Sequence, residues 1–491
     1  MLEKLAKQTA VYGISTIAVR FLSYLLTPYY TRIFGQETYG IVTYVYALIP
    51  LALTLLTMGM ESSYFRFSGK ADAAGGDVAA AKRRLFATTW GITSLAAALF
   101  FGAVLLFRDR ISQWMGPDYV AHPEYVVWVG AIILFDVWSC IPFSRLREQG
   151  RALTFVGLKA LSVVLNVVLA VAFGAAGLFS TDFGVGWVLV ANLAASVVTW
   201  GAVLCTVDRT LPRIDRALLA AVFAYSLPLL IGGLAGTANE FIDRLMIYSL
   251  APVNAGAQLG VYGAITKIAV VMMLFYQMYR LAAEPFFLSN FRKSDFVQMN
   301  AAALKYYVMV SMVIFLGIAL FRDLFALIVG RDFREGIFIL PVVLGANVLT
   351  GVWLNLSFWY KREERTWLAI VVTGAGLAAI VAFGGWLIPR WGYYGAAWAR
   401  LGSETVMVAV SWWLNRRFFP TPYAWPRIGE FVAVALAAFF AAEWFTVLAG
   451  NKIAGYAFNI LVFAGYVAYL VRRERIDLGA MLRAVLKRGE R

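Results

Sequence analysis

Long runs of apolar residues limit most strongly what this chain can fold into. About fourteen stretches hold roughly 20 predominantly apolar residues each, the length that an α-helix needs to cross the hydrocarbon core of a bilayer. Hydrophobic residues make up 61% of the 491 residues and charged residues only 14%, outside the range of soluble globular proteins. Since a backbone in lipid must satisfy its own polar groups, the runs predict an all-α polytopic membrane protein. The predicted spans are residues 9–34, 39–64, 84–107, 124–144, 152–178, 184–207, 217–249, 258–289, 303–321, 335–359, 367–388, 393–415, 428–449 and 453–471.

Two short similarities along the chain indicate an internal duplication. The segment Tyr39-Gly40-Ile41-Val42-Thr43 in the second span matches Tyr262-Gly263-Ala264-Ile265-Thr266 in the eighth, and the same offset places Glu61 on Glu284. Each similarity is short, but a further pair lies at an equivalent place: Arg147-Glu148 follows the fourth span, and Arg362-Glu363 follows the tenth.

The duplication predicts how the spans are grouped. Six spans is an even number, so both copies enter the membrane in the same direction, as parallel repeats related by an axis along the membrane normal. We predict two six-helix bundles with two additional C-terminal helices. The parts are residues 1–210 for the first bundle, 211–420 for its repeat, and 421–491 for the helix pair and a basic tail.

The positive charges are distributed as in a membrane protein. The net charge of +15 would suggest nucleic acid as a partner of a soluble chain. Here most of the excess positive charge lies in alternate short loops, which is the bias of cytoplasmic loops, so we expect cytoplasmic termini and no nucleic acid. The basic loop residues are Arg66, Lys70, Lys82, Arg83 and Arg84, then Arg145, Arg147 and Arg151, then Arg209, Arg213 and Arg216, then Lys361, Arg362 and Arg365, and finally Arg416 and Arg417.

Arg20 lies near the middle of the first span, where a charge is unfavourable. An arginine at the centre of a membrane helix costs about 2.5–3.5 kcal/mol on insertion scales, so such residues normally face protein or water. Arg20 shares one helix face with Thr16 and Tyr24, and similar polar stripes follow spans two and eight. The stripes predict a water-filled cleft between the two bundles, with Arg20 facing it. A structural pair of Arg20 with Glu61 or with a helix carbonyl is the alternative.

Further charges within spans predict the character of this cleft. The cationic side chains outnumber the carboxylates that could face them, which favours an anionic cargo such as a phosphate or pyrophosphate. Tyr and Thr hydroxyls beside them suit the hydroxyls of a sugar. The predicted substrate-binding residues are Arg20, Lys159, Lys267, Arg280, Arg400, Tyr24 and Thr16.

Structural alternatives remain open for several of these charges. Lys159 could pair with Asp136, and Arg400 could pair with Glu404 one helical turn away. Another group lies near the outer end of the seventh span, where side chains can extend to the membrane interface. Its members are Glu240, Asp243 and Arg244.

The pattern of the whole chain resembles a known family. The resemblance rests on the span count, the six-plus-six repeat, the opening LAKQTAVYGISTIAVRFLSYLLTPYYTRIFGQETYGIVTY with its F-G-x-x-x-Y-G motif at Phe34–Gly40, and the later YGAITKIA. The chain resembles bacterial polysaccharide biosynthesis flippases of the O-antigen and capsule type, within the multidrug/oligosaccharidyl-lipid/polysaccharide exporter superfamily. The resemblance implies a multidrug-and-toxin-extrusion-like fold of about 14 transmembrane helices.

The resemblance also implies an activity and a place in the cell. Such a protein would move an undecaprenyl-pyrophosphate-linked oligosaccharide across the bacterial inner membrane, toward the periplasm, by alternating access. Family members use a central arginine of the first helix for the pyrophosphate, and Arg20 fits that position. Membrane lipids would be partners, and a polysaccharide polymerase is left open as a further one. A lipid II flippase and a cation-coupled multidrug exporter of the same fold are the alternatives.

Catalytic and cofactor signals are weak in this sequence. Cys140, Cys205 and the single histidine, His122, form no metal-ligand pattern, and no nucleophile motif or nucleotide-binding glycine loop is recognisable. We therefore expect a transporter with no cofactor or metal, rather than a membrane glycosyltransferase or polymerase. Coupling to H⁺ or Na⁺ is left open, with Asp136, Glu61 and Glu284 as the candidate carboxylates.

Overall fold

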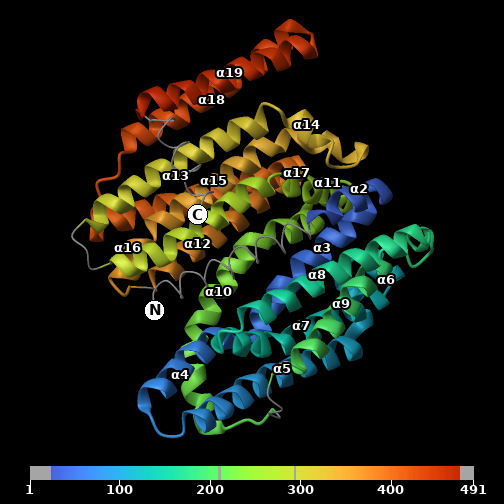
Figure 1. The fold of residues 1–491 in the computed structure, drawn as a ribbon. Coiled ribbons are helices and arrows are strands. Elements are labelled where there is room, and N and C mark those ends of the chain that lie inside the picture. The colour runs from blue at the N-terminus through green and yellow to red at the C-terminus, as the bar shows by residue number, and fades with distance from the viewer. Residues whose placement is uncertain (1–23, 208–211, 292–294, 366, 476–491) are drawn as a thin grey trace, which may run out of the picture. The chain divides into compact units, whose positions relative to one another are not determined.

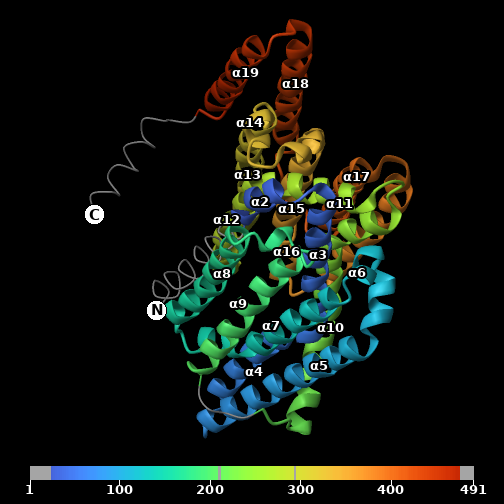
Figure 2. The ribbon, with the colours of Figure 1, turned by 90° about the vertical axis from the view of Figure 1, so that its right-hand side faces the viewer.

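The computed structural model describes residues 24–207, 212–291, 295–365 and 367–475, and all regular structure in these ranges is helical (Figures 1 and 2). The elements are α2 (Leu26–Ile33), α3 (Gln36–Thr57), α4 (Met60–Ala74), α5 (Val78–Met115), α6 (Pro117–Ala121), α7 (Glu124–Glu148), α8 (Ala152–Ala175), η1 (Leu178–Ser180), α9 (Gly186–Leu204), α10 (Arg216–Leu250), α11 (Ala255–Ile268), α12 (Val270–Asn290), α13 (Phe296–Ala319), α14 (Arg322–Ala326), η2 (Arg331–Ile339), α15 (Leu340–Leu356), α16 (Phe358–Arg362), α17 (Leu368–Phe418), α18 (Trp425–Ala449) and α19 (Lys452–Arg473).

The helices confirm the predicted membrane class. Within the described residues, 11 helices are long and apolar enough to cross a membrane, or 12 if the bent pair α11 and α12 is one span. Helix α17, 51 residues long, contains two predicted spans, which are separated at Gly392, where φ is 55° and ψ is −131°. The predicted first span, 9–34, lies mostly outside the described residues. The chain is therefore a multi-pass, all-α membrane protein.

Two spans that were predicted as continuous helices are broken. The second span changes from α3 to α4 at Met58 and Gly59, which both have left-handed backbones with φ of 52° and 68°. The eighth span bends by 51° between α11 and α12, at Ala269. Just before that bend, the Thr266 hydroxyl donates to the Gly263 carbonyl at 3.0 Å, and such side-chain bonds compete with the helix ladder.

Tertiary contacts divide the chain into two compact units. These units are defined by contacts in space, whereas the predicted halves are defined by sequence similarity. The predicted boundaries at residues 210 and 420 therefore stay a prediction. Unit 1 comprises residues 1–267, 329–333 and 366–403, and unit 2 comprises 268–328, 334–365 and 404–491.

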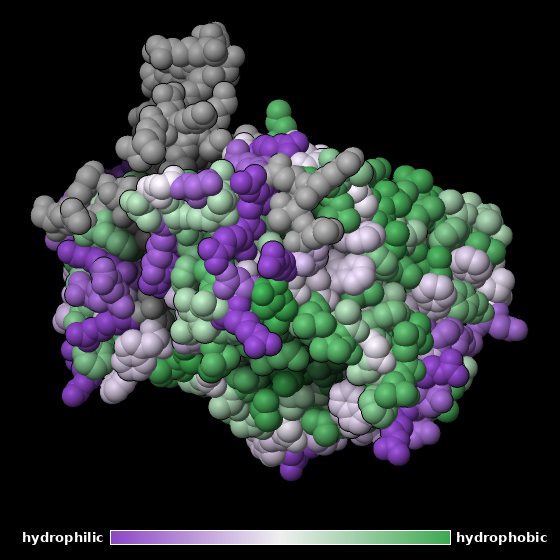
Figure 3. Space-filling view, turned by 90° about the horizontal axis from the view of Figure 1, so that it is seen from below, coloured by the Kyte–Doolittle hydropathy of each residue, from purple (hydrophilic) through white to green (hydrophobic). Residues whose placement is uncertain are grey.

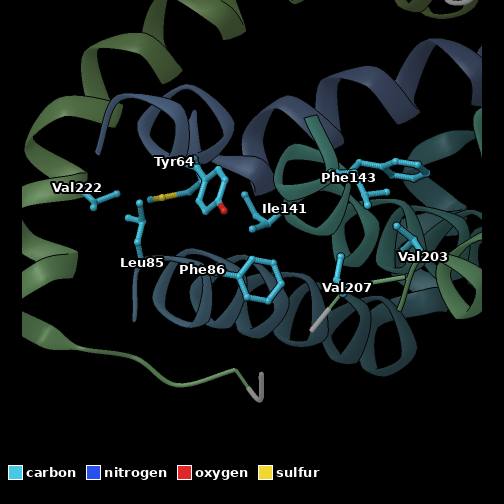
Figure 4. Packing of buried hydrophobic residues seen from close by; sticks show 10 residues of the cluster. Tyr64, Leu85, Phe86, Ile141, Phe143, Val203, Val207 and Val222 are labelled. Atoms are coloured by element: carbon cyan, nitrogen blue, oxygen red, sulfur yellow. The ribbon is translucent and has the colours of Figure 1, made fainter. Parts of the chain in front are cut away.

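Unit 1 has a compact apolar cluster where α4, α5, α7, α9 and α10 meet (Figure 4). Because lipid is as apolar as these side chains, close packing rather than exclusion from water holds such helices together. The cluster therefore fixes the relative positions of the helices that contribute to it. Its buried members are Met60, Tyr64, Leu85, Phe86, Ile141, Phe143, Leu146, Val203, Val207 and Val222.

Unit 2 is held in a similar way by aromatic packing. Phe287 of α12 lies 4.7 Å from Phe358 of α16, measured between ring centroids, and 5.7 Å from Phe296 of α13. Leu354 of α15 belongs to the same buried cluster. Four helices of unit 2 thus share one core.

The outer surface is apolar, as a lipid-facing surface must be. Large hydrophobic side chains are exposed along single helices, including Leu95, Leu99 and Leu106 on α5 and Leu153 and Val168 on α8. On the face drawn in Figure 3, hydrophobic residues form a broad green area, and hydrophilic residues gather toward its edges. This pattern is that of a bilayer-embedded surface with polar ends.

Candidate cationic binding site

The structure brings together two predicted site residues, Tyr24 and Lys267. Arg20 and Thr16, predicted with them, lie outside the described residues. The Lys267 ammonium nitrogen lies 4.8 Å from the centroid of the Tyr24 ring, a cation–π arrangement. Both residues belong to unit 1, and they link the start of the described chain to the last turn of α11.

Lys267 is a cation without an acidic partner in the part of the chain that the structure describes. Its side chain is exposed, and no described carboxylate lies within ion-pair distance. The Arg244 guanidinium and the Glu240 carboxylate are near enough to act on it electrostatically. An ammonium facing hydrocarbon would be unfavourable, so Lys267 marks a polar surface within the membrane-spanning region.

Arg244 belongs to a buried network on α10 and α11. The Asp243 carboxylate, 2% exposed, accepts a hydrogen bond of 2.6 Å from the Tyr262 hydroxyl. It also accepts from the Arg244 guanidinium at 3.3 Å, and the same guanidinium nitrogen donates to the Glu240 carbonyl at 2.8 Å. Asp243 is thus enclosed by protein groups, and its position near the membrane interface stays a prediction.

Arg400 connects α17 to the same stretch of α10. Its side chain is buried, and one guanidinium nitrogen donates to the carbonyls of Asn239 at 2.8 Å and Glu240 at 3.1 Å. The Ser403 hydroxyl bonds the Asn239 side chain at 2.9 Å. The observed contacts brace two helices within unit 1, and contact of Arg400 with cargo stays a prediction.

Lys159 on α8 is a second cation without an ion pair in the described ranges. Its ammonium nitrogen lies 4.2 Å from the centroid of the Phe143 ring, and its side chain is exposed. The Asp136 carboxylate instead accepts a hydrogen bond of 2.8 Å from the Ser196 hydroxyl. The alternative of a direct Lys159–Asp136 ion pair is therefore not found among these residues.

The fourth described cation of the prediction, Arg280, is neutralised within unit 2. Its guanidinium lies 3.4 Å from the Glu284 carboxylate, which also binds Lys361 at 3.0 Å. In unit 1, Glu61 forms an ion pair with Arg147. Two of the three carboxylates predicted for ion coupling thus have basic partners, and the third, Asp136, has a hydroxyl partner.

Glycines allow α3 and α11 to approach very closely in unit 1. A Cβ atom on Gly260 would lie 2.0 Å from the Gln36 carbonyl oxygen, and one on Gly40 would lie 2.0 Å from that of Gly256. Beside them, the Gly330 amide donates to the Thr31 hydroxyl at 3.0 Å, and the Gln36 side chain donates to the Asp332 carbonyl at 2.7 Å. The sequence similarity at Tyr39–Thr43 and Tyr262–Thr266 therefore lies on two helices that touch.

The sequence did not single out Arg244 and Tyr262 as members of one network. The charged triplet in an otherwise apolar span was a visible signal for Arg244. Nothing in the sequence indicated the contact between Tyr262 and Asp243, because these residues lie on different helices and meet only through tertiary packing.

The helical arrangement defines a class of membrane transport folds. The lipid II flippase MurJ, solved in an inward closed conformation, superposes with a TM-score of 0.75 at 12% identity, covering 95% of this chain and 100% of that chain. A multidrug resistance MATE family transporter of the MOP superfamily, solved in an inward-facing conformation, superposes with a TM-score of 0.67 at 16% identity, covering 84% of this chain and 97% of that chain. At these identities the likeness concerns the fold, which is multidrug-and-toxin-extrusion-like.

The family follows from sequence. Residues 5–291 match the model of the polysaccharide biosynthesis protein family, and the chain belongs to that family. Protein 1 of the Lsg locus of Haemophilus influenzae (strain Rd) is 21% identical over 394 residues, which is 77% of this chain and 91% of that protein. The resemblance inferred from the sequence is confirmed.

Proposed function

We propose that this protein is a flippase that moves an undecaprenyl-pyrophosphate-linked oligosaccharide, a repeat unit of an O-antigen or capsule, across the bacterial inner membrane by alternating access. The observation that carries the proposal is Lys267, a cation in a membrane-spanning segment with an aromatic neighbour, Tyr24, and no described carboxylate partner. The family membership supports a polysaccharide-related cargo.

The chemistry of the cargo explains why such a cation is useful. A bare pyrophosphate would lose its hydration on entering hydrocarbon, which is prohibitive without compensating partners. Lys267 and Arg244 supply charge, and Tyr24 supplies a polar aromatic neighbour, while Arg20 is proposed to join them. The lipid tail would remain in the bilayer. Lys159, Arg280 and Arg400 remain further candidates for contact with cargo.

The proposed orientation follows from the basic loops. Arg147 in the last turn of α7, Arg151 after it, and Lys361 and Arg362 at α16 would lie in the cytoplasm, together with both termini. Cargo would then enter from the cytoplasmic leaflet, where lipid-linked units are assembled. A polysaccharide polymerase is a proposed partner on the opposite side.

Two other cargoes fit the same fold. A lipid II flippase would recognise the same pyrophosphate with a different glycan, and the fold of MurJ supports this alternative. A cation-coupled drug exporter is favoured less, because Lys267 and Lys159 would oppose a cationic drug.

Complementation tests the proposal directly. The chain is expressed in bacteria that lack their O-antigen flippase, and surface glycan is measured at matched membrane abundance. Wild type and a control variant, Arg390→Gln, should restore glycan, because the contacts of Arg390 with described residues are with Trp386 on its own helix. Lys267→Ala and Arg20→Ala should not. If wild type instead restores growth only in cells depleted of their lipid II flippase, the alternative cargo is correct.

A further inference from the structure

We propose that Arg244 binds a phosphate group of the cargo through two parallel N–H donors, and that Asp243 is a positioning residue that aims its guanidinium. The inference rests on the proposed function, because it assigns a further residue to the pyrophosphate site. The sequence offered Arg244 only as a side chain that could reach the membrane interface.

Within the described part of the chain, the hydrogen bonds of Arg244 leave one edge of its guanidinium without an acceptor. Arginine has five N–H donors in a planar fork. One terminal nitrogen, Nη1, donates to Asp243 and to the Glu240 carbonyl. Among the residues that the structure describes, no acceptor is bound to Nε or Nη2, and the side chain is 20% exposed. The edge formed by Nε and Nη2 is the one that matches two oxygens of a phosphate.

The surroundings of Arg244 favour an anion. Lys267 and Arg244 act on each other electrostatically, and two like charges in a region of low dielectric repel. The Asp243 carboxylate already accepts hydrogen bonds from Arg244 and Tyr262. The exposed Glu240 carboxylate also acts on Lys267 and offsets part of this repulsion. A phosphate placed against Arg244 and Lys267 would relieve it further, which no neutral ligand could do. Tyr39, 4% exposed, is also within electrostatic range of Arg244.

Asp243 is itself held in a fixed orientation. One carboxylate oxygen accepts the Tyr262 hydroxyl at 2.6 Å, and Tyr262 is 1% exposed. The other accepts the backbone amide of Arg244 at 2.8 Å, together with its guanidinium. A buried side chain with this many fixed contacts cannot rotate freely. Tyr262 thus orients Asp243, and Asp243 orients the inner edge of Arg244 so that the outer edge is presented for binding.

Titration of inorganic pyrophosphate into the purified full chain, in nanodiscs of zwitterionic lipid, tests this assignment by calorimetry. Arg244→Lys keeps the charge but loses the fork, and we expect about tenfold weaker binding. Asp243→Asn and Tyr262→Phe should weaken binding less, by several-fold. The control Arg390→Lys, on α17 and away from the network, should bind as wild type does. Thermal unfolding of each variant verifies that it is folded. If Asp243→Asn does not fold, the affinity of Tyr262→Phe tests the positioning role in its place.

A double-mutant comparison separates positioning from general loss of structure. If Asp243 acts through Arg244, then Asp243→Asn should have no further effect on affinity in an Arg244→Gln background. Additive losses would overturn the positioning role. Unchanged affinity in Arg244→Lys, with wild type binding normally, would overturn the phosphate assignment and leave the proposed function standing. If wild type binds no pyrophosphate, both fail.

Discussion

Glu61 and Arg147 form an ion pair that joins α4 to α7 in unit 1, and unit 2 contains its counterpart. The repeat aligns Glu61 with Glu284, and Glu284 binds Lys361, the residue before the one aligned with Arg147. If the predicted duplication is correct, each copy has a carboxylate near the end of its second span that pairs with a cation after its fourth. A contact at nearly the same place in both predicted copies would indicate a shared structural role.

The Glu61–Arg147 pair should tolerate exchange of its charges. The two side chains are 44% and 41% exposed, and exposed ion pairs contribute about 0–1 kcal/mol. We expect Glu61→Gln or Arg147→Gln to lower the unfolding temperature slightly, and the swap Glu61→Arg with Arg147→Glu to recover part of the loss. Thermal unfolding in detergent measures this. A swap less stable than both single variants would contradict an ion pair as the origin of the effect.

Gly260 should be intolerant of any side chain. Its Cβ position lies 2.0 Å from the backbone oxygen of Gln36, so even alanine would force α3 and α11 apart. Overpacking of this kind costs about 1–3 kcal/mol, and more when backbone must move. We expect Gly260→Ala to lower stability and surface glycan in the complementation assay. The matched control is Gly236→Ala on α10, where an added Cβ would meet no described atom of another part of the chain within 4 Å. Equal behaviour of the two variants would show that the contact is dispensable.

The sequence predicted the membrane class and the approximate spans because hydropathy is a property of single segments. It did not predict the breaks at Met58–Gly59 and at Ala269, because apolar residues continue across both. A broken span and a straight one have the same hydropathy. The break depends on backbone conformation and on packing partners elsewhere in the chain.

The sequence predicted which residues of the site are polar or charged within a span, but it did not predict most of the contacts between helices. A polar stripe of the first span contained Tyr24, whereas Lys267 lies slightly off the stripe of the eighth span and was predicted from its charge and depth, and the structure places the two side chains in contact. The presence of a charge in a span did not distinguish Lys267 from Arg280. Lys267 has no ion pair in the described ranges, whereas Arg280 is bound to Glu284. That difference depends on whether a carboxylate lies nearby in space, which spacing along the sequence does not determine.

Coupling to an ion, if it uses a predicted carboxylate, should depend on Asp136. Glu61 and Glu284 are already bound to basic side chains, whereas Asp136 has only the Ser196 hydroxyl as its hydrogen-bond donor among the described residues. The measurement is the shift of the unfolding temperature when K⁺ is replaced by Na⁺ at constant ionic strength. We expect any such shift in wild type to be absent in Asp136→Asn. Glu61→Gln and Glu284→Gln serve as controls and should keep it. A shift that survives Asp136→Asn would place the ion elsewhere.

Asp215 should make the stability of the chain depend on acid pH. It lies before the first residue of α10, accepts the amides of Ala217 and Leu218 at 3.1 and 3.2 Å, and forms an ion pair with Arg84. The Arg84 guanidinium, with these amides, holds the pKa of Asp215 below its ordinary value. Because the pKa of Asp215 is lower in the folded than in the unfolded chain, its contribution to stability is fully present above the pKa of the unfolded chain, about 3.9. The contribution is lost as the pH falls through the pKa of the folded chain. Asp215→Ala should therefore lower the unfolding temperature at neutral pH and differ less from wild type in acid. A gap between the two proteins that widens on acidification would contradict this assignment, and Asp182→Ala, at an exposed loop position, is the matched control.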